Sequence, residues 1–169
     1  MKILAVDIGT GTQDIYLFDS RLSIENGYRL VLPSPTMMVR RKLRDAASEG
    51  RDVLLSGVDM GGGPSTMAVR AHLKAGLRVF ATPDAAKTLD DHLDNVTSMG
   101  VTLVSDDEGS RLNGRVTRVE MQDFDFNLLR QTFARFGVSL DTLDALAIAV
   151  FDHGAAPVDV SDRKFRFEY

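Results

Sequence analysis

The feature that most limits how this chain folds is a glycine-rich turn between two apolar, β-prone segments near the N-terminus. It reads Asp7-Ile8-Gly9-Thr10-Gly11-Thr12-Gln13-Asp14, with residues 3–8 before it and residues 15–18 after it. Gly9 and Gly11 have no side chains, so the backbone can bend sharply and bring its N–H groups close to an anion. The pattern predicts a strand–turn–strand unit with a phosphate-binding turn.

The other residues of the turn fit the same interpretation. Thr10 and Thr12 add hydroxyl donors, and Gln13 is suited to orient a water molecule or a phosphate. Asp7 ends the first strand, where its carboxylate would hold Mg²⁺ through water. The alternative is a plain hairpin turn in which the Asp7 carboxylate hydrogen-bonds to nearby groups of the chain. The sequence leaves that alternative open.

The stretch from Asp7 to Thr12 resembles the first phosphate motif of the actin-like ATPase superfamily. Sugar kinases, acetate kinase, actin and the heat-shock chaperones share this strand–DxGT–strand beginning. The resemblance implies that Asp7 assists Mg²⁺ and that Gly9, Thr10, Gly11 and Thr12 contact the β- and γ-phosphates of ATP.

The rest of the chain reads as an α/β pattern. A turn at Asn26-Gly27 precedes a third strand at residues 28–32, and helices and strands alternate after Ser34-Pro35. We expect one helix from Pro83 through Leu93 and a polar loop at residues 106–110. The order predicts a ribonuclease-H-like fold: a mixed sheet that begins with a three-strand antiparallel meander and has helices on both faces.

A second glycine loop follows the apolar strand at residues 53–58. It reads Asp59-Met60-Gly61-Gly62-Gly63-Pro64 and opens a helix, whose N-terminus favours anions. In the expected fold the first and fourth strands are parallel neighbours, so Gly61, Gly62 and Gly63 would flank the first turn and Asp59 would add a metal-binding carboxylate. Close helix–strand packing explains the glycines equally well.

Three stretches, "MGGGP", "ATPDAAKTLDD" and "FDHGAAPVDVSDRKFRFEY", resemble an archaeal and bacterial family often labelled as a pyruvate formate-lyase activating enzyme. The resemblance covers residues 3–169. A radical-SAM activase needs three cysteines for its iron–sulfur cluster, and this sequence has none. We therefore expect no cluster bound by cysteine, and the actin-like motif guides the functional hypothesis.

Members of that family are roughly twice as long, which implies a two-lobe protein. We expect residues 1–169 to form one actin-like N-terminal lobe, and residues 152–169 to cross toward a second lobe. A second lobe, a second copy or a partner chain would then complete the nucleotide cleft. Turnover of ATP by this chain alone is not expected.

A rival reading places Mg²⁺-dependent nuclease chemistry on the same fold. Asp141-Thr142-Leu143-Asp144 resembles the C-terminal acidic motif of Holliday-junction resolvases, so Asp7, Asp59, Asp141 and Asp144 would bind the metal. Asp152 and His153 follow the last predicted strand, at residues 146–151, and are candidate catalytic residues under the kinase-like reading. A non-catalytic binding lobe is the third reading.

Charge and composition limit the classes of partner that we expect for this protein. The net charge is −4, which disfavours a nucleic-acid-binding protein, and the basic cluster at residues 40–44 reads as a solvated helix face. No apolar run is long enough to span a bilayer, so we expect a cytoplasmic protein. The functional expectation is an ATP–Mg²⁺-binding lobe of an ATPase or small-molecule kinase, with a nucleotide or phosphorylated small molecule as ligand.

Overall fold

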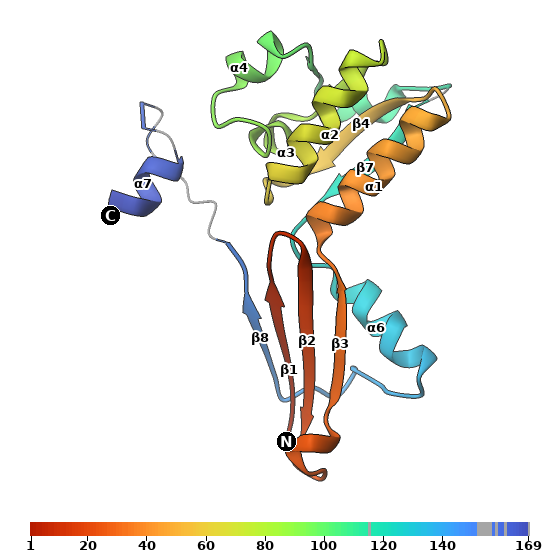
Figure 1. Ribbon diagram of the computed structural model, residues 1–169, viewed down its shortest axis with the longest axis vertical. Helices are drawn as coiled ribbons and strands as arrows, with labels where there is room; N and C mark the ends of the chain where they lie inside the picture. The colour runs from red at the N-terminus through yellow and green to blue at the C-terminus, as the bar shows by residue number, and fades with distance from the viewer. Residues whose placement is uncertain (115, 152–156, 158, 161, 169) are drawn as a thin grey trace. The chain divides into compact units, whose positions relative to one another are not determined.

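The computed structural model describes residues 1–114, 116–151, 157, 159–160 and 162–168. Its packing divides the chain into two compact units, each with its own four-stranded sheet (Figure 1). Unit 1 comprises Met1–Pro35 and Asp123–Phe151, and unit 2 comprises Thr36–Gln122 and Asp152–Tyr169. The chain is therefore a mixed α/β protein with two sheets. The expected single lobe over residues 1–169 stays a prediction.

Unit 1 contains the predicted meander. Its sheet has the order β3-β2-β1-β8, with antiparallel pairing between β1 and β2 and between β2 and β3. A short 3₁₀ turn, η1, links β2 to β3, and β8 is parallel to β1. The bounds are β1 Lys2–Ile8, β2 Thr12–Asp19, η1 Ile24–Asn26, β3 Tyr28–Pro33 and β8 Ala145–Ala149.

One face of this sheet is covered by helix α6 (Phe126–Arg135). Alternate residues of β1 and β2 point toward the helix, where Leu4 and Leu17 are fully buried against Leu129 and Phe133. Burying each such side chain contributes about 1.5–3 kcal/mol, so this contact fixes which face of the strands is inward. Among the described elements of unit 1, no helix covers the opposite face.

Unit 2 is built around a wholly parallel sheet with the order β6-β5-β4-β7. The strands are β4 Asp52–Gly57, β5 Val79–Ala81, β6 Thr102–Leu103 and β7 Val116–Met121. The helices assigned to this unit are α1 Pro35–Ser48, α2 Gly63–Lys74, α3 Pro83–Lys87, α4 Leu93–Ser98, α5 Asp106–Arg111 and α7 Asp162–Glu168.

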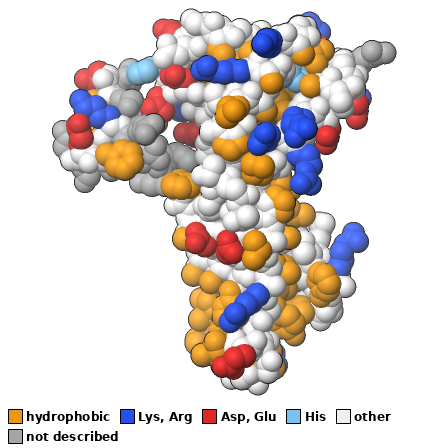
Figure 2. All heavy atoms as spheres, viewed as in Figure 1, with side chains coloured by type: hydrophobic (Ala, Val, Ile, Leu, Met, Phe, Trp, Pro, Cys, Tyr) orange, Lys and Arg blue, Asp and Glu red, His pale blue; other side chains and the backbone are white. Residues whose placement is uncertain are grey.

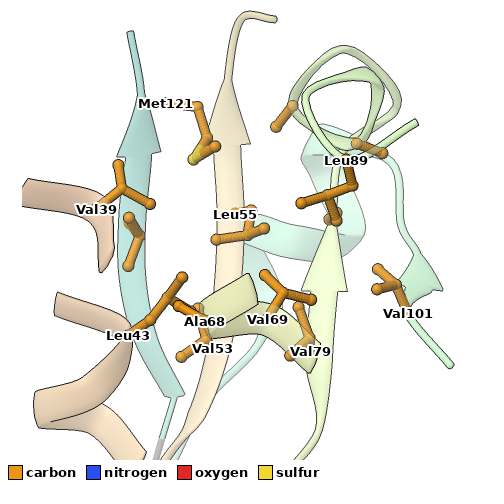
Figure 3. Packing of buried hydrophobic residues seen from close by; sticks show 14 of the residues in the cluster. Val39, Leu43, Val53, Leu55, Ala68, Val69, Val79, Leu89, Val101 and Met121 are labelled. Carbon is orange, nitrogen blue, oxygen red and sulfur yellow. The ribbon is translucent and has the colours of Figure 1, made fainter. Parts of the chain in front are cut away.

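Helices lie on both faces of the unit 2 sheet. Val53 and Leu55 of β4 pack in the cluster that contains Val39 and Leu43 of α1 and Ala68 and Val69 of α2 (Figure 3). Leu54 points to the other face, where its Cδ2 atom lies 3.3 Å from the position that a Cβ on Gly109 of α5 would occupy. The helices α1 and α2 thus share one face, and α5 covers the other.

The prediction that the first and fourth strands are neighbours is wrong. The parallel neighbour of β1 is β8, and β4 lies between β5 and β7 in the other sheet. Residues 36–122 form a separate α/β unit between β3 and α6, so the two sheets replace the single mixed sheet that was expected.

Two local predictions are also wrong. The helix expected from Pro83 through Leu93 is interrupted, because the Asp90 carboxylate accepts hydrogen bonds from the Asn95 side chain and the His92 N–H and so begins α4. The expected polar loop at residues 106–110 is helix α5, which begins with a capping box between Ser105 and Glu108.

Within the described residues, none of the helices has the length and apolar character needed to cross a membrane.

Candidate functional site

The turn between β1 and β2 is held in place by the end of β3. The Gly9 N–H donates to the Thr12 carbonyl (2.9 Å), which closes the turn. Ser34, which is fully buried, donates from its hydroxyl to the Thr10 carbonyl (2.7 Å) and from its N–H to the Gly11 carbonyl (3.1 Å). The Thr10 and Gly11 carbonyls therefore both accept hydrogen bonds from Ser34, and these bonds fix the shape of the turn without a ligand.

The hydrogen-bond donors of the turn remain available. Within the described residues, the N–H groups of Thr10 and Gly11 and the Thr10 hydroxyl donate no hydrogen bond, and both residues are exposed. Backbone N–H groups without an acceptor are the groups that bind anions in turns of this kind. The use of Gly9, Thr10, Gly11 and Thr12 as phosphate-binding residues stays a prediction.

The two glycines of the turn have different roles. A Cβ on Gly9 would lie 3.3 Å from the Thr12 carbonyl oxygen, so Gly9 allows the strands to approach closely. A Cβ on Gly11 would meet nothing within 4 Å, and neither glycine has a positive φ. The turn does not need glycine at position 11 for its conformation, and the missing side chain leaves open space beside the free N–H groups.

Asp7 and Asp14 form a cross-strand pair next to this turn. They are directly opposed in the register of β1 and β2, and both are exposed on the sheet face that α6 does not cover. The Asp7 carboxylate makes no hydrogen bond or ion pair within the described residues, while the Asp14 carboxylate accepts a bond from the Thr12 hydroxyl at 3.3 Å. Like charges in opposed positions destabilise a sheet.

A hollow of about 620 Å³ lies on the same face. Its polar groups are the two carboxylates and the guanidinium of Arg29, whose central carbon lies 5.2 Å above the centre of the Tyr16 ring. The Tyr16 hydroxyl donates to the Ile24 carbonyl (2.8 Å), which fixes the ring. The hollow thus combines an aromatic wall, one cation and two carboxylates; the lining also includes Ala5, Val31, Ala147 and Ala149.

Gln13 is on the other face of the sheet. Its side chain is buried and donates from Nε2 to the Pro33 carbonyl (3.0 Å), as alternation along β2 requires. Gln13 therefore helps to fix β3 beside the turn, and the structure does not place it with Asp7 and Asp14.

The second glycine loop belongs to unit 2. It follows β4 and leads into α2, at the point where the strand order changes from β5 on one side of β4 to β7 on the other, which is where ligands bind in open parallel sheets. Gly62 is required by packing, because its Cβ would lie 2.1 Å from the Thr88 carbonyl oxygen. Gly63 has open space around it.

Further contacts tie this loop to its own unit. The Thr88 hydroxyl accepts from the Met60 N–H (3.0 Å) and contacts Asp59 Oδ1 at 3.3 Å, and the Thr36 hydroxyl donates to the Gly61 carbonyl (2.8 Å). Asp59 and Gly61–Gly63 thus lie in unit 2, and Asp7 and Gly9–Thr12 lie in unit 1. The expectation that the two glycine segments meet at one sheet edge loses its basis, because β1 and β4 are not neighbours.

The acidic pair of the nuclease reading is at the opposite end of the unit 1 sheet. The Asp144 carboxylate accepts from the Lys2 N–H (2.6 Å) at the beginning of β1, and Asp141 pairs with Arg130 (3.2 Å). Asp7 is five residues further along β1, about 16 Å away at the rise of an extended strand. The four carboxylates of that reading do not converge.

Asp152 and His153 lie outside the described residues. No group of three or more metal-ligating His, Asp or Glu side chains occurs in the part of the chain that the structure describes. Sequence reasoning assigned no role to Asp14; the signal was the hairpin itself, since a turn centred on Thr10 and Gly11 places residue 14 opposite residue 7.

Comparisons with known proteins give one finding. The family model described as "Putative pyruvate format-lyase activating enzyme (DUF1786)" matches residues 60–169, about two thirds of the chain. No curated protein matches the chain. Because the match extends over more than half of the sequence, the protein belongs to this family.

Proposed function

We propose that unit 1 binds the phosphate groups of a nucleotide, with Mg²⁺ at Asp7 and Asp14 and with the turn from Gly9 to Thr12 as the phosphate cradle. The protein would be the phosphate-binding part of an ATPase or small-molecule kinase. The single observation that carries this proposal is the opposed Asp7–Asp14 pair beside a turn with free N–H donors.

The number of protein ligands suits magnesium. Two carboxylates leave most of an octahedral shell to water and phosphate oxygens, which is how Mg²⁺ is usually held in nucleotide sites. When bound, the ion would neutralise charge on the phosphates. The residues of this chain would position it: Asp7 and Asp14 from adjacent strands, and Thr12, whose hydroxyl holds the Asp14 carboxylate.

The strand arrangement of unit 1 supports the resemblance to actin-like ATPases. An antiparallel meander, a helix and then a strand parallel to β1 give the order expected for a ribonuclease-H-like core. In this reading residues 36–122 are an insertion between β3 and α6. The proposal also requires a second lobe, a second copy or a partner to bind the adenosine, so turnover by this chain alone is not expected.

The activity in the family description does not fit the residues present. An activating enzyme of that kind holds an iron–sulfur cluster with three cysteines, and the sequence contains no cysteine. The residues present therefore give no support to radical chemistry. They do not support the nuclease alternative either, because Asp7 and Asp144 lie at opposite ends of the unit 1 sheet.

Calorimetric titration of Mg–ATP into the full chain tests the proposal. Asp7→Asn and Asp14→Asn should each weaken binding at least about tenfold, because each removes one carboxylate from the metal. Asp107→Asn is the matched control, since Asp107 is an exposed carboxylate on α5, and it should bind like the wild type. Equal affinity in all four proteins, or no binding of ATP or pyrophosphate by the wild type, would refute the proposal.

A further inference from the structure

The charge of this chain is unevenly distributed between its elements. Helices α1 and α2 contain six Lys or Arg side chains and one acid, Asp45, so together they carry a formal charge of +5. The whole chain has a charge of −4, which leaves −9 on all other residues. The basic face comprises Arg40, Arg41, Lys42 and Arg44 of α1 and Arg70 and Lys74 of α2.

The basic face lies on one side of the unit 2 sheet. Both helices direct their apolar side chains at the same β4 residues, Val53 and Leu55, so both present their remaining side chains to solvent from the same layer (Figure 3). Figure 2 shows Lys and Arg side chains gathered over this part of the molecule. Five of the six cations are exposed and Arg40 is half-buried.

These six cations are unpaired in the part of the chain that the structure describes. Within the described residues they make no hydrogen bond and no ion pair, whereas Arg21, Arg78 and Arg130 each pair with an aspartate. Arg40 and Arg44, and likewise Arg70 and Lys74, are four residues apart, so each pair places two like charges on adjacent turns of one helix. Such spacing destabilises a helix, so the fold alone gives no reason for it.

The rows of cations fit a ligand with regularly repeated negative charges. Adjacent turns of a helix are 5.4 Å apart, so each helix presents charges at a spacing that a flexible phosphodiester backbone can follow. The apolar side chains that pack on β4 are buried in the core, and six of the seven charged side chains on the two helices are Lys or Arg. That arrangement provides electrostatic binding without any means of reading bases.

We propose that the basic face of α1 and α2 binds the phosphate backbone of a nucleic acid without sequence preference. The partner is distinct from the nucleotide proposed for unit 1, and neither proposal depends on the other. The net charge of −4 does not oppose this binding, because the contact is confined to the face of unit 2 on which these cations lie.

The test is fluorescence anisotropy of a labelled 20-nucleotide single strand with the full chain at 50 and 200 mM salt. Four to six phosphate contacts predict that the wild type loses about 50- to 300-fold in affinity over this range. The double substitution Arg40→Gln/Arg44→Gln should weaken binding roughly tenfold at 50 mM salt. It should also reduce the slope of log affinity against log salt by the amount that corresponds to about two phosphate contacts.

The matched control is Arg111→Gln/Arg135→Gln, which removes two exposed cations from α5 and α6, outside the basic face. Far-UV circular dichroism confirms that each variant is folded. The proposal is overturned if the wild type does not bind the strand at 50 mM salt, or if the control loses as much affinity as the α1 variant. It is also overturned if poly-glutamate or vesicles with anionic lipid bind the protein more tightly than the single strand does at the same concentration of negative charges.

Discussion

Asp7 and Asp14 are directly opposed across the β1–β2 hairpin, and both carboxylates are exposed on the face that α6 leaves uncovered. This pairing costs stability when no cation is present, because like charges in opposed positions repel. A site that stores repulsion in its free form and relieves it with a cation is consistent with a metal–phosphate function.

Asp7→Asn or Asp14→Asn should therefore stabilise the ligand-free protein. Removal of one charge relieves the cross-strand repulsion, and we expect a gain of about 0.2–1 kcal/mol in the free energy of unfolding. Urea denaturation at low salt measures it. The gain should shrink at high salt, where exposed charges are screened. A loss of stability in both variants would show that the carboxylates support the fold instead.

The two glycines of the turn should respond differently to alanine. Gly11→Ala should leave the free energy of unfolding within about 0.5 kcal/mol of the wild type, because its Cβ enters open space, but should weaken Mg–ATP binding. Gly9→Ala should cost about 1 kcal/mol, because its Cβ is 3.3 Å from the Thr12 carbonyl. Denaturation and calorimetry on the same samples separate the effects. Unchanged binding of Mg–ATP by Gly11→Ala would contradict the proposal that this turn binds phosphate.

Several elements of both units were predictable because their signals are local. Alternation of apolar residues and the Asn26-Gly27 turn specify the meander, and Ser34-Pro35 marks the beginning of α1. The capping box that begins α5 was also present in the sequence, as Ser105 and Glu108 three residues apart, and it explains why the predicted loop there is a helix.

The division into two sheets was not predictable in the same way. An alternating helix–strand pattern has the same period whether its strands join the first sheet or form another one, so nothing local in β4 excludes β1 as its neighbour. The partner of β1 is β8, and the two residues at every paired site are 142 positions apart in the sequence. Consequently the sequence pattern groups Asp59 with Asp7 and does not draw attention to Asp14.

Two neighbouring glycines in the loop of unit 2 provide a second pair of matched alanine variants. Gly62→Ala should destabilise the protein by about 2 kcal/mol or more, because its Cβ would overlap the Thr88 carbonyl oxygen at 2.1 Å and the backbone must move. Gly63→Ala should be neutral or slightly stabilising, since it adds a good helix former in open space. Thermal unfolding distinguishes them. Equal stability of the two variants would count against this packing.

His72 should make unit 2 sensitive to acid. The side chain is buried, and burial lowers the pKa of His72 below its usual 6.5, while the nearby backbone of Leu43 and Arg51 and the charge of Asp52 act in the opposite direction. The unfolded chain then binds a proton more readily than the folded chain, so stability falls as the pH drops below about 6.5.

The slope is at most about 1.4 kcal/mol per pH unit for one proton. Urea midpoints measured between pH 7.5 and 5 should show this loss in the wild type and in the exposed control His92→Gln. His72→Leu should reduce it. The same pH dependence in His72→Leu would assign the effect to other groups.

Amide chemical shifts in a titration with Mg–ATP test the central claim most directly. The account predicts that the backbone N–H signals of Thr10 and Gly11 shift most, that Asp14 follows, and that the shifts shrink when EDTA removes Mg²⁺. Shifts confined to unit 2, or no shifts near Thr10 and Gly11 at saturating Mg–ATP, would contradict it.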